Sequence, residues 1–179
     1  MKILDANFGG VYLIRFERKG DERGYFQRLY SRKEFSEIHL NNMWPQINLS
    51  KTIRKGTVRG LHFQTKPSEE IKLVTCLNGT VFDVVVDIRP NSKYFGQWRS
   101  FEISDENGFS IYIPKGFAHG FQALSDDCIL SYLMSCKYNS KMAKGLAYND
   151  PGLNILWPLP VCCISEADKK LPFLQDIAK

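Results

Sequence analysis

Short stretches in which apolar and polar residues alternate dominate the chain. Residues 80–89, "TVFDVVVDIR", are the clearest case, because alternation divides them into two unlike faces. One face is apolar apart from Thr80, and the other carries Val81, Asp83, Val85, Asp87 and Arg89. A face of mixed apolar and charged residues is expected where the inner side of a strand lines a polar cavity.

Similar runs recur along the chain, separated by turn signals such as Asn78-Gly79 and Pro90-Asn91. They predict further strands at residues 11–16, 25–30, 56–63, 71–79, 98–103, 108–114, 120–124 and 128–136. Many short strands with frequent turns are typical of a sandwich or barrel. The pattern therefore predicts an all-β, jelly-roll-like fold.

Helical periodicity is scarce. Residues 31–41 have a plausible N-cap at Ser31, followed by apolar Phe35, Ile38 and Leu40. Residues 165–174 begin like a capped turn and are interrupted by Pro172. We expect a few short helices beside the strands.

The composition fits one domain over residues 1–179, since the chain is 44% hydrophobic and has no linker-like tract or repeat. The first residues contain no apolar run long enough for a signal peptide or membrane span, so we expect a cytoplasmic protein without membrane contact. Five cysteines without CxxC spacing indicate buried free thiols rather than disulfides or a zinc site.

The net charge is +5, with basic residues spread along the chain. This charge is too mild to indicate a nucleic acid partner, but it suits a small anionic ligand such as a diphosphate.

His62, one of three histidines, lies within the strand-like "GTVRGLHFQ". The residues alone leave three interpretations: a packed core histidine, a metal ligand, or a general base facing a cavity. A metal site would need further ligands at suitable spacing, but the next candidates are Glu69, Glu70 and the distant His119. The metal interpretation is therefore the weakest of the three.

Arg59 and His62 would lie on opposite faces of a regular strand. A β-bulge at Gly60 would bring both toward one site. Polar residues also occur inside other predicted strands, and they are rarely buried unless paired or functional. Together they favour a shared polar cavity: Lys72, Asp83, His119 and Tyr132.

Seven segments occur in an order that resembles the dTDP-4-dehydrorhamnose 3,5-epimerase family of nucleotide-sugar epimerases. They are "DERGYF", "GTVRGLHFQ", "IKLV", "VFDVVVDIRPNS", "FGQW", "IPKGFAHGF" and "YNDPGLNILWP". The resemblance extends from about Leu13 to Leu174. It implies a cupin-type jelly roll, a homodimer with strand exchange at the N-terminus, and no metal or cofactor.

The resemblance also implies a reaction. A nucleoside-diphosphate-linked 4-keto-6-deoxyhexose would lose a proton at C3 or C5 to give an enolate and regain one on the opposite face, as in deoxysugar and lipopolysaccharide O-antigen synthesis. By position, His62 matches the base and Asp168 the carboxylate that orients it. Lys72 matches the lysine near the keto oxygen, and Tyr132 matches the proton donor.

Substrate-binding positions are implied in the same way. Arg23, Arg59 and His119 match residues that hold the diphosphate and sugar, and Tyr138 matches an aromatic that stacks on the base. Gln46 and Asn48 belong to a binding segment, and Arg28 stands where the family has a nucleotide-contacting glutamate. We expect Asp83 to pair with Lys72 or to line the same cavity.

The departures from the family pattern concern the nucleotide end. Beside Arg28, they are Ile47 and Leu49 in "QINLS", Ala143 and Ala167. The Arg28 guanidinium would suit the N3 acceptor of cytosine, whereas the N3–H donor of thymine suits a carboxylate. The sequence thus leaves open a dTDP-linked or a CDP-linked substrate.

The sequence is also compatible with other functions. One is a mono-epimerase acting at C3 or C5 only. A second is a sugar-nucleotide-binding cupin without catalysis, although a binder would not need a matched base and acid. A third is a metal-dependent cupin oxygenase.

Overall fold

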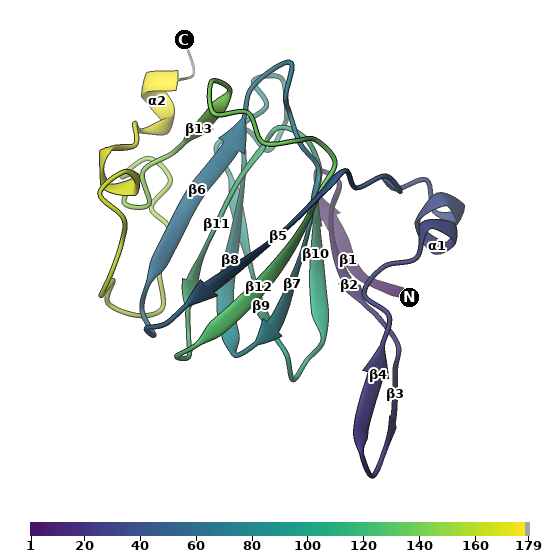
Figure 1. Ribbon diagram of the computed structural model, residues 1–179. Coiled ribbons are helices and arrows are strands. Elements are labelled where there is room, and N and C mark those ends of the chain that lie inside the picture. Colours follow the sequence, from purple (N-terminus) through teal and green to yellow (C-terminus); the bar gives the residue numbers. More distant parts are fainter. Residues whose placement is uncertain (178–179) are drawn as a thin grey trace.

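The computed structural model describes residues 1–177 and places most of the chain in two antiparallel β-sheets that face each other (Figure 1). The first sheet has six strands in the order β1-β2-β10-β7-β12-β5. Their bounds are β1 Lys2–Phe8, β2 Val11–Arg15, β10 Phe109–Ile113, β7 Lys72–Asn78, β12 Cys128–Met134 and β5 Gln46–Thr52.

The second sheet has five strands in the order β13-β6-β11-β8-β9. Their bounds are β13 Ala143–Gly145, β6 Val58–Gln64, β11 Phe117–Ala123, β8 Thr80–Asp87 and β9 Trp98–Ser104. Neighbours far apart in sequence, such as β6 and β11, make this a jelly-roll arrangement rather than a simple meander. The all-β prediction is confirmed.

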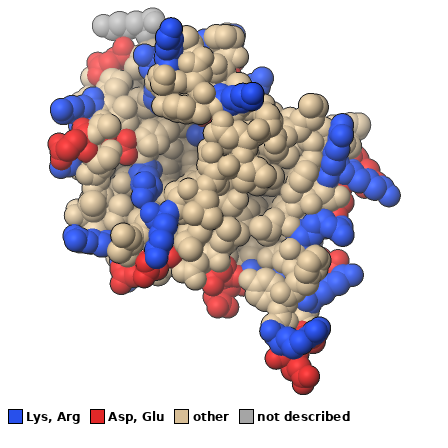
Figure 2. Space-filling model, in the orientation of Figure 1, with Lys and Arg blue, Asp and Glu red and all other residues tan. Residues whose placement is uncertain are grey.

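A separate hairpin, β3 Arg18–Asp21 and β4 Gly24–Gln27, projects away from the two sheets (Figure 1). Its tip carries both basic and acidic side chains (Figure 2). The helix α1, Arg32–Glu37, follows this hairpin, and the Ser31 hydroxyl caps it by accepting a hydrogen bond from the Glu34 N–H. The predicted cap is confirmed, but α1 ends before Asn41.

The C-terminal segment contains a 3₁₀ turn, η1 Asp168–Lys170, and a short helix α2, Leu174–Ile177, on either side of Pro172. The predicted turn is therefore confirmed. Neither α1 nor α2, the α-helices within residues 1–177, has the length and apolar character needed to span a membrane.

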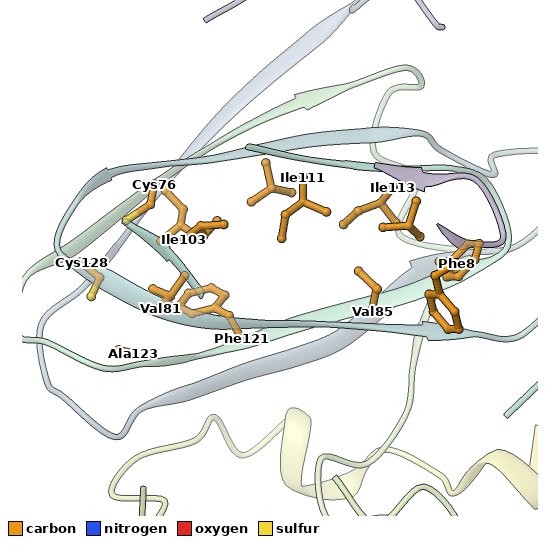
Figure 3. Close-up of a cluster of buried hydrophobic side chains, with 14 residues drawn as sticks. Phe8, Cys76, Val81, Val85, Ile103, Ile111, Ile113, Phe121, Ala123 and Cys128 are labelled. Atoms are coloured by element: carbon orange, nitrogen blue, oxygen red, sulfur yellow. The ribbon is translucent and has the colours of Figure 1, made fainter. Parts of the chain in front are cut away.

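An apolar cluster fills part of the space between the two sheets (Figure 3). Val81 and Val85 of β8 point into it, as the alternation in residues 80–89 predicts. There they meet Cys76, Ile111 and other side chains of the first sheet. Burial of these apolar side chains is the main force that holds the sheets together. Val84 and Val86 point the other way, into a second cluster with Leu61 and Leu146.

The cysteine prediction holds only in part. All five cysteines are free thiols, and Cys76 and Cys128 are buried in the inter-sheet cluster. Cys136 is half-buried. Cys162 and Cys163 are exposed, because they lie in a loop segment that runs over the surface after β13.

Candidate active site

A cavity of about 640 Å³ opens between the two sheets. This volume is in the range of small-molecule binding sites. Side chains from both sheets and from the C-terminal turn line it, and they include Arg59, His62, Lys72, His119, Tyr132 and Asp168. The shared polar cavity predicted from the sequence is therefore present.

A bulge in β6 brings Arg59 and His62 to the same cavity. In the register of the two strands, His62 lies opposite His119 and Arg59 lies opposite Phe121. The chain therefore advances three residues along β6 but only two along β11. Gly60 lies inside the bulge with a φ of +111°, and a Cβ there would approach Gly120 Cα to 2.7 Å. Only glycine fits this close approach. The predicted bulge at Gly60 is confirmed.

His62 and Asp168 form a hydrogen-bonded pair at the cavity wall. His62 Nε2 lies 2.7 Å from Asp168 Oδ1, and the Gly60 N–H donates to Asp168 Oδ2 at 3.3 Å. Burial raises the pKa of the Asp168 carboxyl, but the hydrogen bonds from His62 and Gly60 outweigh burial and hold the pKa below its usual range. An ionised Asp168 keeps the proton on Nε2, which leaves Nδ1 as the nitrogen able to accept another.

His119 and Asp83 form a second pair, which is far more buried. His119 Nε2 lies 2.8 Å from Asp83 Oδ2, and the two side chains are 5% and 0% exposed. Burial raises the pKa of Asp83, and the neighbouring His119 and Lys72 oppose that rise. The expected pairing of Asp83 with Lys72 is wrong, because Asp83 lies behind His119 and does not line the cavity.

Tyr132 enters the cavity from β12 in the sheet opposite His62. Its hydroxyl is 3.0 Å from the Ser50 hydroxyl on the neighbouring β5, and its ring meets His119 edge to face. Burial raises the pKa of Tyr132 well above its usual value, and the Ser50 hydrogen bond only partly offsets this. The phenol is therefore a proton carrier at neutral pH rather than a phenolate.

Lys72 begins β7, and its ammonium reaches the same cavity. Nζ lies 3.3 Å from Glu70 Oε1 and donates to the His62 backbone carbonyl at 3.1 Å. Burial lowers the pKa of Lys72, and the charge of Glu70 opposes this effect most strongly. Lys72 and His62 are thereby joined directly across β6 and β7.

Gln46, Asn48 and Tyr138 lie together elsewhere on the cavity lining. Gln46 Oε1 accepts the Tyr138 N–H at 2.9 Å, and Gln46 Nε2 donates to Asn48 Oδ1 at 3.0 Å. The Tyr138 side chain is 66% exposed, so its ring remains available to a ligand. Leu49 and Ala143 also line the cavity, whereas Ile47 and Ala167 do not.

Arg23 and Arg28 do not reach the cavity of their own chain. Arg23 lies at the tip of the β3–β4 hairpin and is bound bidentately to Asp21. Arg28 follows the hairpin and pairs with Glu34 of α1 at 3.5 Å. The other predicted site residues, apart from Asp83, all line the cavity.

Sequence reasoning missed Ser50, Gln64 and Glu70, which line the same cavity. One signal was available: Gln46, Asn48 and Ser50 repeat with a period of two, and so do Glu70 and Lys72. Within residues 1–177, no three His, Cys, Asp or Glu side chains gather in a way that could hold a metal ion.

Comparison with known proteins shows which family this chain resembles. Residues 5–176 match the family model described as dTDP-4-dehydrorhamnose 3,5-epimerase. A protein of that name from Sinorhizobium fredii is 41% identical, over 99% of this chain and 91% of the relative. A dTDP-4-dehydrorhamnose 3-epimerase from Streptomyces niveus is 38% identical, over 98% and 85%.

A solved structure shows the same architecture. The dTDP-6-deoxy-D-glucose-3,5-epimerase from Legionella pneumophila, in complex with dTDP-4-keto-L-rhamnose, superposes with a TM-score of 0.92 at 37% identity. The match covers 97% of this chain and 93% of that one. The cupin-type jelly roll expected from the sequence is thereby confirmed.

Proposed function

This chain belongs to the dTDP-4-dehydrorhamnose 3,5-epimerase family, and from that premise we propose that it epimerises a nucleoside-diphosphate-linked 4-keto-6-deoxyhexose. It acts as an isomerase of deoxysugar synthesis, and the catalytic unit is residues 1–179 as one domain. The observation that carries the proposal is the His62–Asp168 pair at 2.7 Å, open to the cavity that also holds Tyr132 and Lys72.

His62 is the proposed base. The ketone at C4 of the sugar acidifies the C–H bonds at C3 and C5, so a positioned imidazole can remove either proton. Asp168 occupies Nε2, and Nδ1 takes the substrate proton. The ionised carboxylate also stabilises the imidazolium that results. The 52% exposure of the His62 side chain lets a substrate approach it.

Tyr132 is the proposed acid and Lys72 the proposed electrostatic stabiliser. His62 belongs to one sheet and Tyr132 to the other, so a sugar between them meets the base on one face and the phenol on the opposite face. Removal on one face and return on the other inverts the carbon. The Lys72 ammonium opposes the negative charge that develops on the C4 oxygen.

Arg59 and His119 are the proposed contacts to the diphosphate and sugar. Arg59 is tied through Nε to the Thr52 hydroxyl at 2.9 Å and through a terminal nitrogen to the Lys51 carbonyl, which fixes its guanidinium at the cavity edge. A planar guanidinium suits phosphate oxygens. Tyr138, Gln46 and Asn48 are the proposed contacts to the nucleotide base.

A homodimer is part of the proposal. Arg23 and Arg28 lie outside the cavity of their own chain, so they could serve a site only in a second copy. The hairpin carries Tyr25 and Phe26, which are 56% and 71% exposed, as an apolar surface for such contact. Sedimentation analysis should give a dimer at micromolar concentration, and a stable monomer would contradict this part.

The proposed nucleotide is thymidine diphosphate, because the Legionella relative is complexed with a dTDP-sugar. The cytidine alternative rests on Arg28, whose ion pair with Glu34 would have to rearrange before the guanidinium met a base. Titration of the protein with dTDP and CDP separates the two. Tighter binding of CDP than of dTDP would favour the cytidine-linked substrate, and equal or tighter binding of dTDP would contradict it.

Deuterium uptake from D₂O tests the function itself. We expect the protein to introduce solvent deuterium at C3, C5 or both when it is incubated with a panel of nucleoside-diphosphate 4-keto-6-deoxyhexoses. NMR of the products identifies the centre and so separates a 3,5-epimerase from a mono-epimerase. Absence of uptake with every sugar, despite binding, would contradict catalysis and favour a binding protein.

A further inference from the structure

We infer that Glu70 is a positioning residue for the reaction, because its carboxylate holds the Lys72 ammonium in the cavity as a cation. This inference rests on the proposed epimerisation and extends it to a residue outside the expected set of catalytic and binding residues. Lys72 can oppose the charge of an enolate only while it is protonated and aimed at the substrate. The chain must therefore supply something that keeps a buried lysine charged.

The Glu70–Lys72 pair is buried rather than superficial. Lys72 Nζ lies 3.3 Å from Glu70 Oε1, and the two side chains are 9% and 5% exposed. Glu70 lies two residues before Lys72, in the segment that leads into β7, so the ion pair is local in sequence. Lys72 also donates to the His62 carbonyl at 3.1 Å, which fixes the direction of the ammonium.

Glu70 is itself fixed by Gln64, two residues after His62 on β6. Gln64 Nε2 donates to Glu70 Oε2 and, at 3.1 Å, to the Ser68 carbonyl. Gln64 Oε1 accepts the Asn139 N–H at 2.6 Å, so the amide has no freedom to turn away. Gln64 therefore holds Glu70 Oε2, and Glu70 Oε1 pairs with Lys72.

The electrostatics of the cavity explain why Lys72 needs a carboxylate such as Glu70 to remain protonated. Burial lowers the pKa of Lys72, which favours loss of the proton, and Glu70 is the strongest opposing influence, with Asp83 of β8 adding to it. Asp168 also lines the cavity, but its carboxylate is paired with His62 instead of Lys72. Tyr132 on β12, His62 on β6 and His119 on β11 carry no negative charge at neutral pH, so Glu70 and Asp83 are the carboxylates that oppose the effect of burial on the pKa of Lys72.

The charge state of Lys72 can be measured without substrate. ¹³C NMR of the lysine Cε signals, with Lys72 assigned through Lys72→Met, gives its titration midpoint in the full chain. We expect Glu70→Gln to lower the midpoint by about one pH unit or more, since a close opposite charge commonly shifts a pKa by this amount. The matched control is Glu69→Gln, which removes an adjacent carboxylate that has no bond to Lys72.

Kinetics then connect the charge to the reaction. In Glu70→Gln, the basic limb of the exchange rate should move to lower pH by the same interval, while the dTDP affinity stays within about twofold. Glu69→Gln should move neither. If wild-type protein exchanges no proton in any sugar, the proposed function fails, and the NMR midpoint still reports on the Glu70–Lys72 pair.

An unchanged Lys72 midpoint in Glu70→Gln would overturn the inference. If that variant does not fold, the thermal midpoints of Lys72→Met and of the double variant Glu70→Gln/Lys72→Met decide. Lys72→Met leaves a buried carboxylate without its partner, so adding Glu70→Gln should raise the midpoint. A double variant that is no more stable than Lys72→Met would show that Glu70 acts only through its hydrogen bond to Gln64, and not through its charge. That result would also overturn the inference.

Discussion

Two histidine–aspartate pairs lie at the same cavity, and they differ mainly in exposure. His62–Asp168 and His119–Asp83 have nearly equal lengths, 2.7 and 2.8 Å. His62 is 52% exposed, whereas His119 is 5% exposed and Asp83 is entirely buried. The pKa of Asp168 is lowered by its hydrogen bonds, but the pKa of Asp83 is raised by burial.

This difference separates a pair suited to proton transfer from one suited to positioning. A base must exchange its proton with a ligand, and of the two rings only His62 has an open approach. His119 lines the cavity and Asp83 lies buried behind it, and Asp83 Oδ1 has no hydrogen-bond partner within residues 1–177. Any change of protonation there would place an unmatched charge in a low-dielectric site.

Asp168→Asn should have the largest effect. The Gly60 N–H would hold the asparagine oxygen, so the amide N–H would face His62 Nε2 and drive the ring proton onto Nδ1. The base would then be blocked, and we expect the turnover rate to fall by about 10²- to 10⁴-fold with little change in dTDP affinity.

Steady-state kinetics and nucleotide titration check this outcome. Glu166→Gln is the matched control, because Glu166 is a nearby exposed carboxylate that pairs with Lys169 instead of His62. A similar loss of turnover in both variants would mean that general charge, rather than the tautomer of His62, is responsible.

His119→Asn should mainly affect stability. The variant leaves Asp83 buried without its partner, and breaking a buried pair costs about 3–5 kcal/mol in the free energy of unfolding. His62→Asn should cost less, about 1 kcal/mol, because the His62 ring is half-exposed and the buried Asp168 carboxylate keeps the hydrogen bond from the Gly60 N–H. Urea unfolding of the two variants measures both costs, and equal costs would contradict the distinction between the pairs.

Gly60→Ala should have a smaller effect on stability, of about 2–3 kcal/mol, and it connects the two pairs. A Cβ there would approach the His119 carbonyl to 2.8 Å and would be strained at a φ of +111°. Gly24→Ala is the control, since its φ of +122° brings the same strain, but a Cβ there would meet no atom of another segment of residues 1–177 within 4 Å. Thermal unfolding that is equally affected by both would show that the close approach to β11 is unimportant.

The sequence indicated the fold and much of the site because particular residues have few alternatives. Gly60 between Arg59 and His62 predicts a bulge, and Asp83 within an apolar run predicts an inward polar group. The sequence could not identify the partner of Asp83, since β8, β11 and β7 meet only in the folded chain. His119 became the partner because β11 pairs directly with β8.

Strand β5 was missed for a physical reason. Its polar residues Gln46, Asn48 and Ser50 line the cavity, while Ile47 is 67% exposed on the opposite face. This pattern reverses the usual rule that apolar side chains face inward. An edge strand whose inward side lines a polar site is therefore poorly predicted from alternation alone.

We propose that His62, and not His119, removes the substrate proton. The direct measurement is deuterium incorporation from D₂O into the 4-keto sugar by the wild type, His62→Asn and His119→Asn, with each protein confirmed as folded. We predict that His62→Asn loses incorporation by at least about 10²-fold, whereas His119→Asn stays within about tenfold of the wild type. Undiminished incorporation by His62→Asn, with loss in His119→Asn, would contradict the assignment of His62 as the base.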